Sequence, residues 1–235
     1  MSKNYNVVIL TGAGISAESG ISTFRDANGL WENHDIQEVA TPEGFAKNPE
    51  LVLRFYNQRR QQLHQVAPNA AHLAITKLAN HTQVKVVTQN IDDLHERAGN
   101  PFVLHLHGEL FKARSTVNER HIVEWKGDIQ IGDLCPQNGQ MRPHIVWFGE
   151  MVPKLPEAIQ LVEKATHIII VGTSMQVYPA ASLVDYAGPN VPIYYIDPKP
   201  AINEMMGYRR INVIPEVATI GLSNLVDQLI LELEP

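Results

Sequence analysis

Three polar side chains follow two short apolar stretches of the chain and have the types needed for proton transfer and hydrogen bonding. His107 comes shortly after the stretch 102–104, and Asn90 and Asp92 follow the stretch 84–87. A neutral imidazole can take a hydroxyl proton near neutral pH, so His107 is a candidate general base. Asn90 can donate and accept hydrogen bonds, and Asp92 can accept one from an amide N–H. Each also has a structural interpretation, as a hydrogen-bonded histidine or as caps for the next helix.

A glycine motif, Gly12-Ala13-Gly14-Ile15-Ser16-Ala17, follows a third apolar stretch, 7–10. We expect Gly12 to permit a tight turn, Gly14 to remove a side chain where a pyrophosphate approaches, and Ala17 to let a helix pack closely. Free N–H groups at the start of that helical turn would face the anion. Nucleotide binding is therefore the favoured interpretation, although such glycines also serve only to shape turns.

The spacing after this motif argues against ordinary hydride transfer. A dinucleotide oxidoreductase has an acidic ribose ligand about twenty residues past the glycines, at the end of the next strand. Here the next apolar stretch does not begin until Val84. An inserted module therefore occupies the first crossover.

The elements that must position these groups predict a doubly wound, Rossmann-like α/β fold. Compact apolar stretches predict strands at 7–10, 84–87, 102–104, 168–171 and 193–196. Helical patterns lie at 69–79, 156–165, 179–186 and 223–231, with Pro179 in a first turn and Ser223 as a cap. Fully apolar strands that alternate with amphipathic helices indicate a parallel sheet covered on both faces.

Two long insertions predict a second, smaller domain. The segments 28–68 and 109–143 are much longer than the usual connections of such a fold. We expect them to form a helical module and a ribbon-like module that pack together. The large domain then consists of 1–27, 69–108 and 144–235, and a cleft should run between the two domains.

Composition narrows the range of partners. The 235 residues are 44% hydrophobic and 19% charged, which fits a globular protein with a sizeable core. A net charge of −6, spread along the chain, disfavours nucleic-acid and membrane partners, and the apolar stretches are too short to cross a bilayer. The single cysteine, Cys135, excludes an intrachain disulfide and a four-cysteine zinc site. We expect a cytoplasmic monomer.

Several separate segments, taken in order from about residue 6 to the C-terminal helix, resemble the bacterial members of the sirtuin family. They are Gly12-Ala13-Gly14-Ile15-Ser16-Ala17-Glu18-Ser19-Gly20-Ile21, Thr23-Phe24-Arg25-Asp26, Gly29-Leu30-Trp31, Thr88-Gln89-Asn90-Ile91-Asp92, Leu94-His95, Ala98-Gly99, Leu106-His107-Gly108-Glu109, Arg142-Pro143, Val146-Trp147-Phe148-Gly149-Glu150 and Gly172-Thr173-Ser174. One block alone is weak, but the ordered set is specific.

The resemblance implies an NAD-dependent deacylase of protein lysines that consumes NAD without redox chemistry. In such enzymes the acyl oxygen of a modified lysine attacks the anomeric carbon of the nicotinamide ribose, and nicotinamide leaves. A base, here His107, then activates a ribose hydroxyl, and water finally releases lysine and an O-acyl-ADP-ribose. The resemblance gives Asn90 and Asp92 the nicotinamide ribose and carboxamide end of NAD, and it leaves His105 a structural role.

The resemblance also implies the remaining contacts of cofactor and peptide. The implied NAD contacts are Gly12, Ala13, Gly14, Ile15, Ala17, Thr23, Phe24, Arg25, Trp31, Gln89, Asn90, Ile91, Asp92, Gly172, Thr173, Ser174, Asp197 and Ala218. Arg25 belongs to a cofactor loop, in which Phe24 would shield the reactive ribose from water. Asp197 would bind adenosine ribose, because Tyr195 stands where the family often has an asparagine. Phe148, Gly149 and Val177 would hold the acylated peptide as an added strand.

Tyr56 and Arg59 lie at positions i and i+3 of a predicted helix and share one face. A phenol and a guanidinium in a partly apolar pocket bind a distal carboxylate through charge-assisted hydrogen bonds. The pattern resembles the sirtuins that remove succinyl and malonyl groups. The alternative is a core tyrosine beside a surface arginine.

Most sirtuins bind zinc through four cysteines in the small domain. Here Ser115 and Asn118 stand about where the first pair would be, and the spacing of His121 and His144 makes no recognisable ligand pair. We predict no structural zinc, so packing and hydrogen bonds must hold this module together.

Three other functions compete with deacylation. A mono-ADP-ribosyltransferase would use the same NAD cleavage with a protein nucleophile. A non-catalytic NAD-sensing module would not require the base, so His107 together with Asn90 and Asp92 argues against it. A plain oxidoreductase ranks last.

Overall fold

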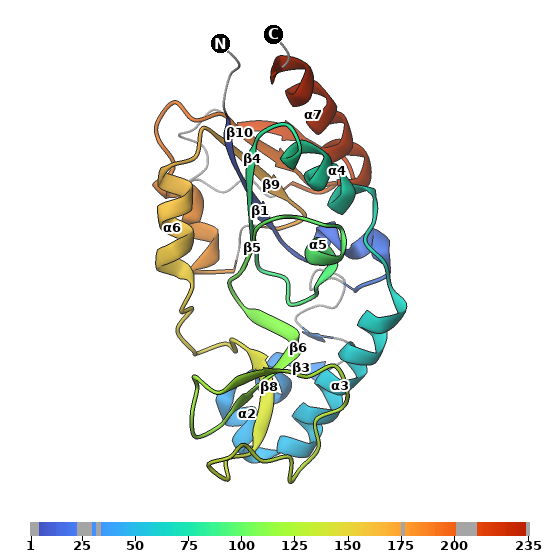
Figure 1. Cartoon of the computed structure of the whole chain (residues 1–235), viewed down its shortest axis with the longest axis vertical. Coiled ribbons are helices and arrows are strands. Elements are labelled where there is room, and N and C mark those ends of the chain that lie inside the picture. Colours follow the sequence, from blue (N-terminus) through green and yellow to red (C-terminus); the bar gives the residue numbers. More distant parts are fainter. Residues whose placement is uncertain (1–4, 23–29, 32–33, 175–176, 201–210, 234–235) are drawn as a thin grey trace.

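The computed structural model describes residues 5–22, 30–31, 34–174, 177–200 and 211–233. Six parallel strands form one sheet in the order β11-β10-β9-β1-β4-β5 (Figure 1). They are β1 (Asn6–Thr11), β4 (Gln83–Thr88), β5 (Val103–His105), β9 (His167–Val171), β10 (Ile193–Ile196) and β11 (Ile211–Ile214). The chain runs outward from β1 to β5, crosses back, and runs outward again from β9 to β11. The doubly wound parallel sheet predicted from the sequence is confirmed.

Helices cover both faces of this sheet, which explains why its strands are continuously apolar. They are α4 (Ala70–Ala79) and α7 (Ala218–Leu233) on one face, and α6 (Leu155–Glu163) with the 3-10 helix η4 (Ala180–Tyr186) on the other. Successive strand side chains point to opposite faces. In β1, Val7 and Ile9 pack in the core with α4 and α7, whereas Val8 and Leu10 pack in the core with α6 and η4.

The C-terminal part of the sheet differs from the prediction in three places. β11 had no counterpart in the sequence analysis. Helix α7 begins at Ala218, so Ser223 lies inside it and donates to the Thr219 carbonyl instead of capping the helix. The cap comes from Glu18, whose carboxylate accepts the N–H and O–H of Thr219 at 3.1 and 2.6 Å. Pro179 precedes η4 as its N-cap, outside the first turn.

A second region lies at the end of the molecule away from both termini (Figure 1). Its antiparallel sheet has the order β7-β6-β8, formed by β6 (Gly108–Ser115), β7 (Ile122–Glu124) and β8 (Met141–Ile145). Beside it lie the hairpin β2 (Leu30–Trp31) and β3 (His34–Asp35), and the helices α1 (Ile36–Val39), α2 (Pro42–Lys47) and α3 (Pro49–Gln65). The exact division of the chain into two domains stays a prediction.

Helix α3 is fixed against this second region by specific polar contacts. Its first turn is capped by Asn48, whose side chain accepts the Leu51 N–H. Further along, the fully buried Arg60 donates from Nε to the Leu110 carbonyl at 2.9 Å. Asn57 exchanges two hydrogen bonds with the backbone of Ile129. The helix therefore presents a fixed face toward the centre of the molecule.

Within the described ranges, no helix is long and apolar enough to cross a membrane.

Candidate active site

A cavity of about 800 Å³ lies where the two regions meet. It opens at the carboxyl edge of the parallel sheet, between β1 and β9, where the strand order reverses. Ligands of doubly wound folds bind at this point. Its wall includes these residues predicted from the sequence: Gly12, Ala13, Gly14, Ala17, Trp31, Tyr56, Arg59, Gln89, Asn90, Ile91, Asp92, His107, Phe148, Gly149, Gly172, Thr173, Ser174, Val177, Asp197 and Ala218.

Four predicted site residues are not part of that wall as described. Ile15 is fully buried and packs into the core beneath the glycine turn, so its side chain does not line the cavity. Thr23, Phe24 and Arg25 lie outside the described residues.

The glycines of the first turn are required by a neighbouring loop of the protein. A Cβ atom on Gly14 would lie 2.6 Å from the Gly172 Cα, and one on Gly12 would lie 2.7 Å from the Thr173 Cβ. Gly172 itself has a φ of +61°, and a Cβ there would lie 2.3 Å from the Ile15 nitrogen. The loops after β1 and β9 therefore interlock through their backbones. This is a different reason for Gly14 from the pyrophosphate approach that we predicted.

The predicted row of free N–H groups is also wrong for most of this turn. Two short 3-10 turns, η1 (Ala13–Ile15) and η2 (Ala17–Ser19), replace a regular helix. Gly14 N–H donates to the Gly172 carbonyl at 2.8 Å, and the Ile15 and Ser16 N–H groups donate within the turn. The turn is thus stabilised internally and shapes the cavity wall.

Asn90 is held so that one end of its amide remains for a ligand. Its Nδ2 donates to the Gly12 carbonyl at 3.1 Å and to Ser16 Oγ at 3.3 Å. Both hydrogen bonds of Nδ2 go to groups of the protein, so Oδ1 is the end of the amide that remains for a ligand. This oxygen can accept a hydrogen bond from a ligand hydroxyl.

Asp92 shares the same hydroxyl and also caps a helix. Ser16 Oγ donates to Asp92 Oδ2 at 3.0 Å, and Oδ1 accepts the Leu94 N–H at the start of α5 (Leu94–Arg97). Burial raises the pKa of Asp92 to about 6, against the opposing effect of these two hydrogen bonds. Keeping this carboxylate ionised in the folded protein therefore costs free energy. Ser16, which donates to it, is a site residue that was not predicted from the sequence. Its signal was a small hydroxyl residue directly after the glycine turn.

His107 is held in one tautomer. Its Nδ1 lies 3.1 Å from the Gln89 carbonyl, which can only accept, so Nδ1 carries the hydrogen. The other ring nitrogen, Nε2, is then unprotonated in the neutral ring. Burial lowers the pKa of His107, although the Gln89 hydrogen bond opposes this, so the ring is neutral at neutral pH. The result is a proton acceptor at the cavity wall.

His105, two residues earlier on the chain, has a different environment. Its Nδ1 lies 2.9 Å from the Asn90 carbonyl and its Nε2 lies 2.7 Å from the Glu96 carboxylate, so both nitrogens donate. Burial alone would lower the pKa of His105, but the hydrogen bond and charge of Glu96 outweigh it and the net pKa is raised. This ring stabilises the chain behind the site and does not line the cavity.

The opposite end of the cavity lies beside β10. Tyr195 is fully buried and donates to the Thr173 carbonyl at 2.9 Å, so it supports the loop after β9. Asp197 lines the cavity, and its Oδ1 accepts the Lys199 N–H at 2.8 Å. Lys199 also lines the cavity and was missed by the sequence analysis.

The cavity wall formed by α3 is aromatic and cationic. Tyr56 is fully buried, and its oxygen accepts the Trp147 Nε1–H at 3.0 Å, which leaves the phenol hydrogen to donate elsewhere. Burial raises the pKa of Tyr56 above its ordinary value, so the phenol stays neutral. Arg59 lies over the Phe55 ring, 4.3 Å from its centroid, and donates to the Phe55 carbonyl. The contact between Tyr56 and Trp147 was not predicted from the sequence.

An ion-pair cluster fixes Trp147 in turn. The Glu150 carboxylate pairs with Arg114 at 2.7 Å and with Arg142 at 2.9 Å, and it accepts the Trp147 N–H. The Arg142 guanidinium lies 3.3 Å from the centre of the Trp147 rings. The segment beside Tyr56 is therefore rigid. Further along it, Phe148 and Gly149 line the cavity, and Val177 lines it too; their role in holding a peptide stays a prediction.

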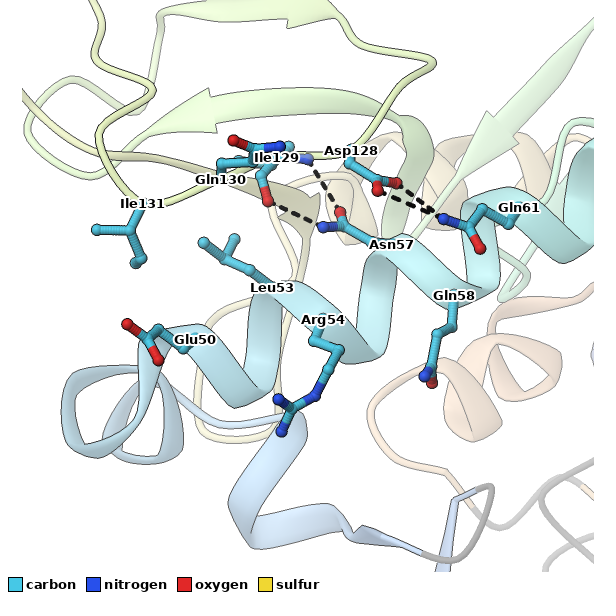
Figure 2. Close-up of a pocket in the computed structure, with 10 residues that line it drawn as sticks. All are labelled: Glu50, Leu53, Arg54, Asn57, Gln58, Gln61, Asp128, Ile129, Gln130 and Ile131. Atoms are coloured by element: carbon cyan, nitrogen blue, oxygen red, sulfur yellow. Dashed lines mark hydrogen bonds between the residues drawn. The ribbon is translucent and has the colours of Figure 1, made fainter.

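A second pocket, of about 560 Å³, lies on the other side of α3 against residues 128–131 (Figure 2). Asn57 bridges to the backbone of Ile129 there, and Gln61 contacts Asp128. No sequence-predicted site residue is among the described residues that line it.

The position expected for zinc cysteines is held by hydrogen bonds and apolar packing. Cys135 Sγ accepts the Ser115 O–H at 3.1 Å and the Gly139 N–H at 3.3 Å. Ser115 Oγ in turn accepts the N–H groups of Val117 and Asn118. Cys135 packs against Leu53, Ala113, Ile129 and Met141. In the described part of the chain, no three histidine, cysteine or acidic side chains come together as metal ligands.

A doubly wound sheet with a large cavity at its switch point defines a nucleotide-binding class of protein. Comparison with known proteins gives the family: residues 12–179 match the Sir2 family, and this chain belongs to it. A protein of Helicobacter pylori named NAD-dependent protein deacylase is 56% identical over 225 residues, which cover 96% of this chain and 97% of that protein.

Two solved structures extend the comparison. A Sir2 homologue in complex with NAD has a TM-score of 0.85 and 38% identity, covering 97% of this chain and 90% of its own. A Sir2 protein bound to an acetylated peptide has a TM-score of 0.74 and 30% identity, covering 96% of this chain and 92% of its own. The sirtuin resemblance is therefore confirmed.

Proposed function

We propose that this chain is an NAD-dependent protein lysine deacylase that transfers the acyl group to ADP-ribose and releases nicotinamide. The observation that carries the proposal is the tautomer of His107, fixed by the Gln89 carbonyl, in a cavity shared with Asn90 and Asp92. Binding alone requires no such base. The name of the Helicobacter pylori relative and the NAD complex of the Sir2 homologue support the same assignment.

The cavity fits an extended dinucleotide in size and in lining. Its volume of about 800 Å³ lies within the range of ligand sites, and it reaches from Asp197 beside β10 to His107 beside β6. When bound, NAD supplies the electrophilic ribose carbon and the ADP-ribose to which the acyl group is transferred. The Asp197 carboxylate is suited to accept from ribose hydroxyls at the adenosine end.

At the other end, three side chains divide the work. His107 Nε2 takes a hydroxyl proton, while the Nδ1–H bond to Gln89 keeps the ring oriented and stabilises its charged form. Asn90 Oδ1 orients a ribose hydroxyl by accepting from it. Asp92, positioned by Ser16, accepts from a carboxamide N–H at the nicotinamide end.

The acylated lysine enters between Phe148 and Gly149 on one side and Val177 on the other. Backbone pairing at such an edge selects an extended peptide and tolerates varied side chains. The acetylated-peptide complex of the related Sir2 protein supports this site. The cellular substrates we propose are acylated lysines of cytoplasmic proteins.

The acyl chain then points toward α3, and we propose that acidic acyl groups such as succinyl and malonyl are preferred there. Arg59 supplies a permanent positive charge, and the Tyr56 phenol has its hydrogen to donate because its oxygen accepts from Trp147. Within this wall, both groups suit a carboxylate better than they suit the methyl group of an acetyl.

One assay tests the whole proposal. The purified protein is incubated with NAD and matched acetyl-, malonyl- and succinyl-lysine peptides, and nicotinamide, deacylated peptide and O-acyl-ADP-ribose are quantified. We expect equal amounts of the three products, with higher kcat/KM for the acidic acyl peptides. A mass gain of ADP-ribose on the peptide would instead indicate a mono-ADP-ribosyltransferase, and NADH absorbance would indicate an oxidoreductase. No turnover of any peptide would overturn the proposal.

A further inference from the structure

A chain of hydrogen bonds lies behind the cavity wall and ends at the backbone of Asn90. His95 Nε2 lies 3.1 Å from Thr11 Oγ, Thr11 Oγ lies 2.8 Å from Thr88 Oγ, and Asn90 N–H donates to Thr88 Oγ at 3.0 Å. His95, Thr11 and Thr88 are fully buried, and none of the three lines the cavity. The chain joins the carboxyl ends of β1 and β4 to helix α5.

Asn100 sets the direction of the bond between His95 and Thr11. Its Nδ2 lies 3.1 Å from the His95 carbonyl and 3.4 Å from the His72 carbonyl, so the amide nitrogen must face these acceptors. The same nitrogen lies 3.5 Å from His95 Nδ1, and because an amide nitrogen cannot accept a hydrogen bond, Nδ1 is the ring nitrogen without a hydrogen. His95 then carries its hydrogen on Nε2 and donates to Thr11, and Thr11 donates to Thr88.

The environment keeps His95 in this neutral form. Burial lowers the pKa of His95 well below its ordinary value, and the nearby His72 and His105 rings lower it further. His105 holds the other backbone group of the same residue, because its Nδ1–H donates to the Asn90 carbonyl. The backbone N–H of Asn90 is thus held through the hydrogen bonds that begin at His95, and its carbonyl is held by His105.

We infer that His95, Thr11 and Thr88 are positioning residues that fix the Asn90 peptide, and through it the amide at the reacting end of the cavity. The inference rests on the proposed function, since it concerns how Asn90 is placed for deacylation. The hydrogen-bonded chain of His95, Thr11 and Thr88, called the relay below, connects β4 to the glycine turn that follows Thr11. Asn90 Nδ2 donates to the Gly12 carbonyl of that turn. Removing the Thr11 oxygen leaves Thr88 Oγ without its donor and His95 Nε2–H without its acceptor, so Thr88, the acceptor of the Asn90 N–H, is held less firmly. Small displacements of positioning groups cost large factors in rate.

Thr11 offers the sharpest test because valine matches its shape and lacks only the hydroxyl. We expect Thr11→Val to lower kcat about tenfold with little change in KM for NAD, and Thr11→Ser to restore most of the loss. The control is Thr82→Val, which removes a hydroxyl hydrogen-bonded to the Tyr5 carbonyl at the other end of β4. Thermal unfolding is measured for all three variants. If Thr11→Val matched Thr82→Val in kcat at equal stability, the inference would be overturned.

His95 gives a second, independent pair. The Nε of glutamine can reach Thr11 as the ring nitrogen does, whereas asparagine is one methylene shorter. We expect His95→Gln to retain most of kcat and His95→Asn to lose about as much as Thr11→Val, with no further loss when the latter two are combined. Additive losses would show that the residues do not act as one relay. Failure of the wild-type protein to turn over any peptide would refute the proposed function instead, so the two outcomes are distinguishable.

Discussion

The two walls of the cavity are built in different ways. At the carboxyl edge of the parallel sheet, backbone groups do most of the positioning: the loops after β1 and β9 interlock through glycines, and a main-chain carbonyl fixes His107. At the α3 wall, side chains position one another. Trp147 contacts Tyr56, and Arg142 and Glu150, which flank Trp147 in the chain, pair with each other and hold its ring and its backbone N–H.

In the proposed reaction, the first wall would hold the reacting groups and the α3 wall would bind the acyl chain. A wall made of backbone contacts tolerates few substitutions, because any added Cβ meets another loop. A wall made of side chains on a helix changes its charge and size with single substitutions, while the reacting groups stay in place. The acyl preference can therefore vary in this fold without rebuilding the catalytic edge.

The largest effect is expected at the catalytic edge. His107→Ala removes the proton acceptor, and we expect kcat for deacylation to fall by about 10²–10⁴-fold. NAD binding, measured by calorimetry, should stay within about threefold, because several loops contribute to the cavity. His81→Ala, an exposed histidine in the turn before β4, is the control. Near-normal turnover by His107→Ala would contradict the assignment of the base.

The acyl wall should respond selectively. Arg59→Met keeps the unbranched apolar stem of the side chain and removes its charged group, so we expect kcat/KM for a succinyl peptide to fall by about 100-fold. The value for an acetyl peptide should change by less than about threefold, because no carboxylate is lost. Arg54→Met is the control, since Arg54 lies at the second pocket (Figure 2) and does not line the first cavity. Equal losses on both peptides would refute the acidic-acyl pocket.

The same two walls explain what the sequence could predict. The strands and the catalytic edge were predictable, because buried parallel strands are continuous apolar stretches and the site residues follow them within a few positions. Ser16 and Trp147 were missed as contacts because their partners, Asp92 and Tyr56, are distant in sequence. Such pairings depend on packing that no local pattern encodes.

Two errors near the C-terminus have the same origin. The strand β11 is short and only partly buried, so it lacks the apolar stretch that revealed the other strands. The start of α7 was placed too late because its cap, Glu18, is 201 residues away from Thr219 and Ser223 was the nearest local candidate. A local capping rule cannot anticipate a cap supplied by tertiary structure.

A glycine joins the two walls, and its replacement should cost stability. Gly108 has a φ of +85°, and a Cβ there would lie 2.0 Å from the His144 carbonyl oxygen. We expect Gly108→Ala to lower the free energy of unfolding by about 3 kcal/mol, from backbone strain and overpacking together. Gly132→Ala separates the two causes, because Gly132 has a φ of +94° with nothing within 4 Å. It should cost about 1 kcal/mol. If urea unfolding gave the same loss of stability for Gly108→Ala and Gly132→Ala, the backbone at His144 would have moved away and overpacking would not contribute.

Asp92 should reveal a conflict between stability and activity at the catalytic edge. Its pKa is about 6 in the folded protein against an ordinary 3.8, so the folded state binds this proton more tightly. Its contribution to stability is therefore complete below pH 3.8 and is lost as the pH rises through 6. We expect Asp92→Asn to raise the free energy of unfolding by about 2 kcal/mol at pH 8.

The gain from Asp92→Asn should shrink between pH 6 and pH 4, while deacylation is strongly reduced at every pH. The control, Asp227→Asn, removes an exposed partner of Lys77 and should change stability by less than about 0.5 kcal/mol. A gain that did not depend on pH would mean that the carboxyl group is not the cause.

The smallest effect is expected from metal removal at the far end of the antiparallel sheet. Cys135 Sγ accepts hydrogen bonds from Ser115 and Gly139 and packs against apolar side chains, so this turn is stabilised without a bound ion. We expect metal analysis to find no stoichiometric zinc and a strong chelator to leave the melting temperature unchanged, because no binding free energy is withdrawn from the folded state. One tightly bound zinc per chain would contradict this.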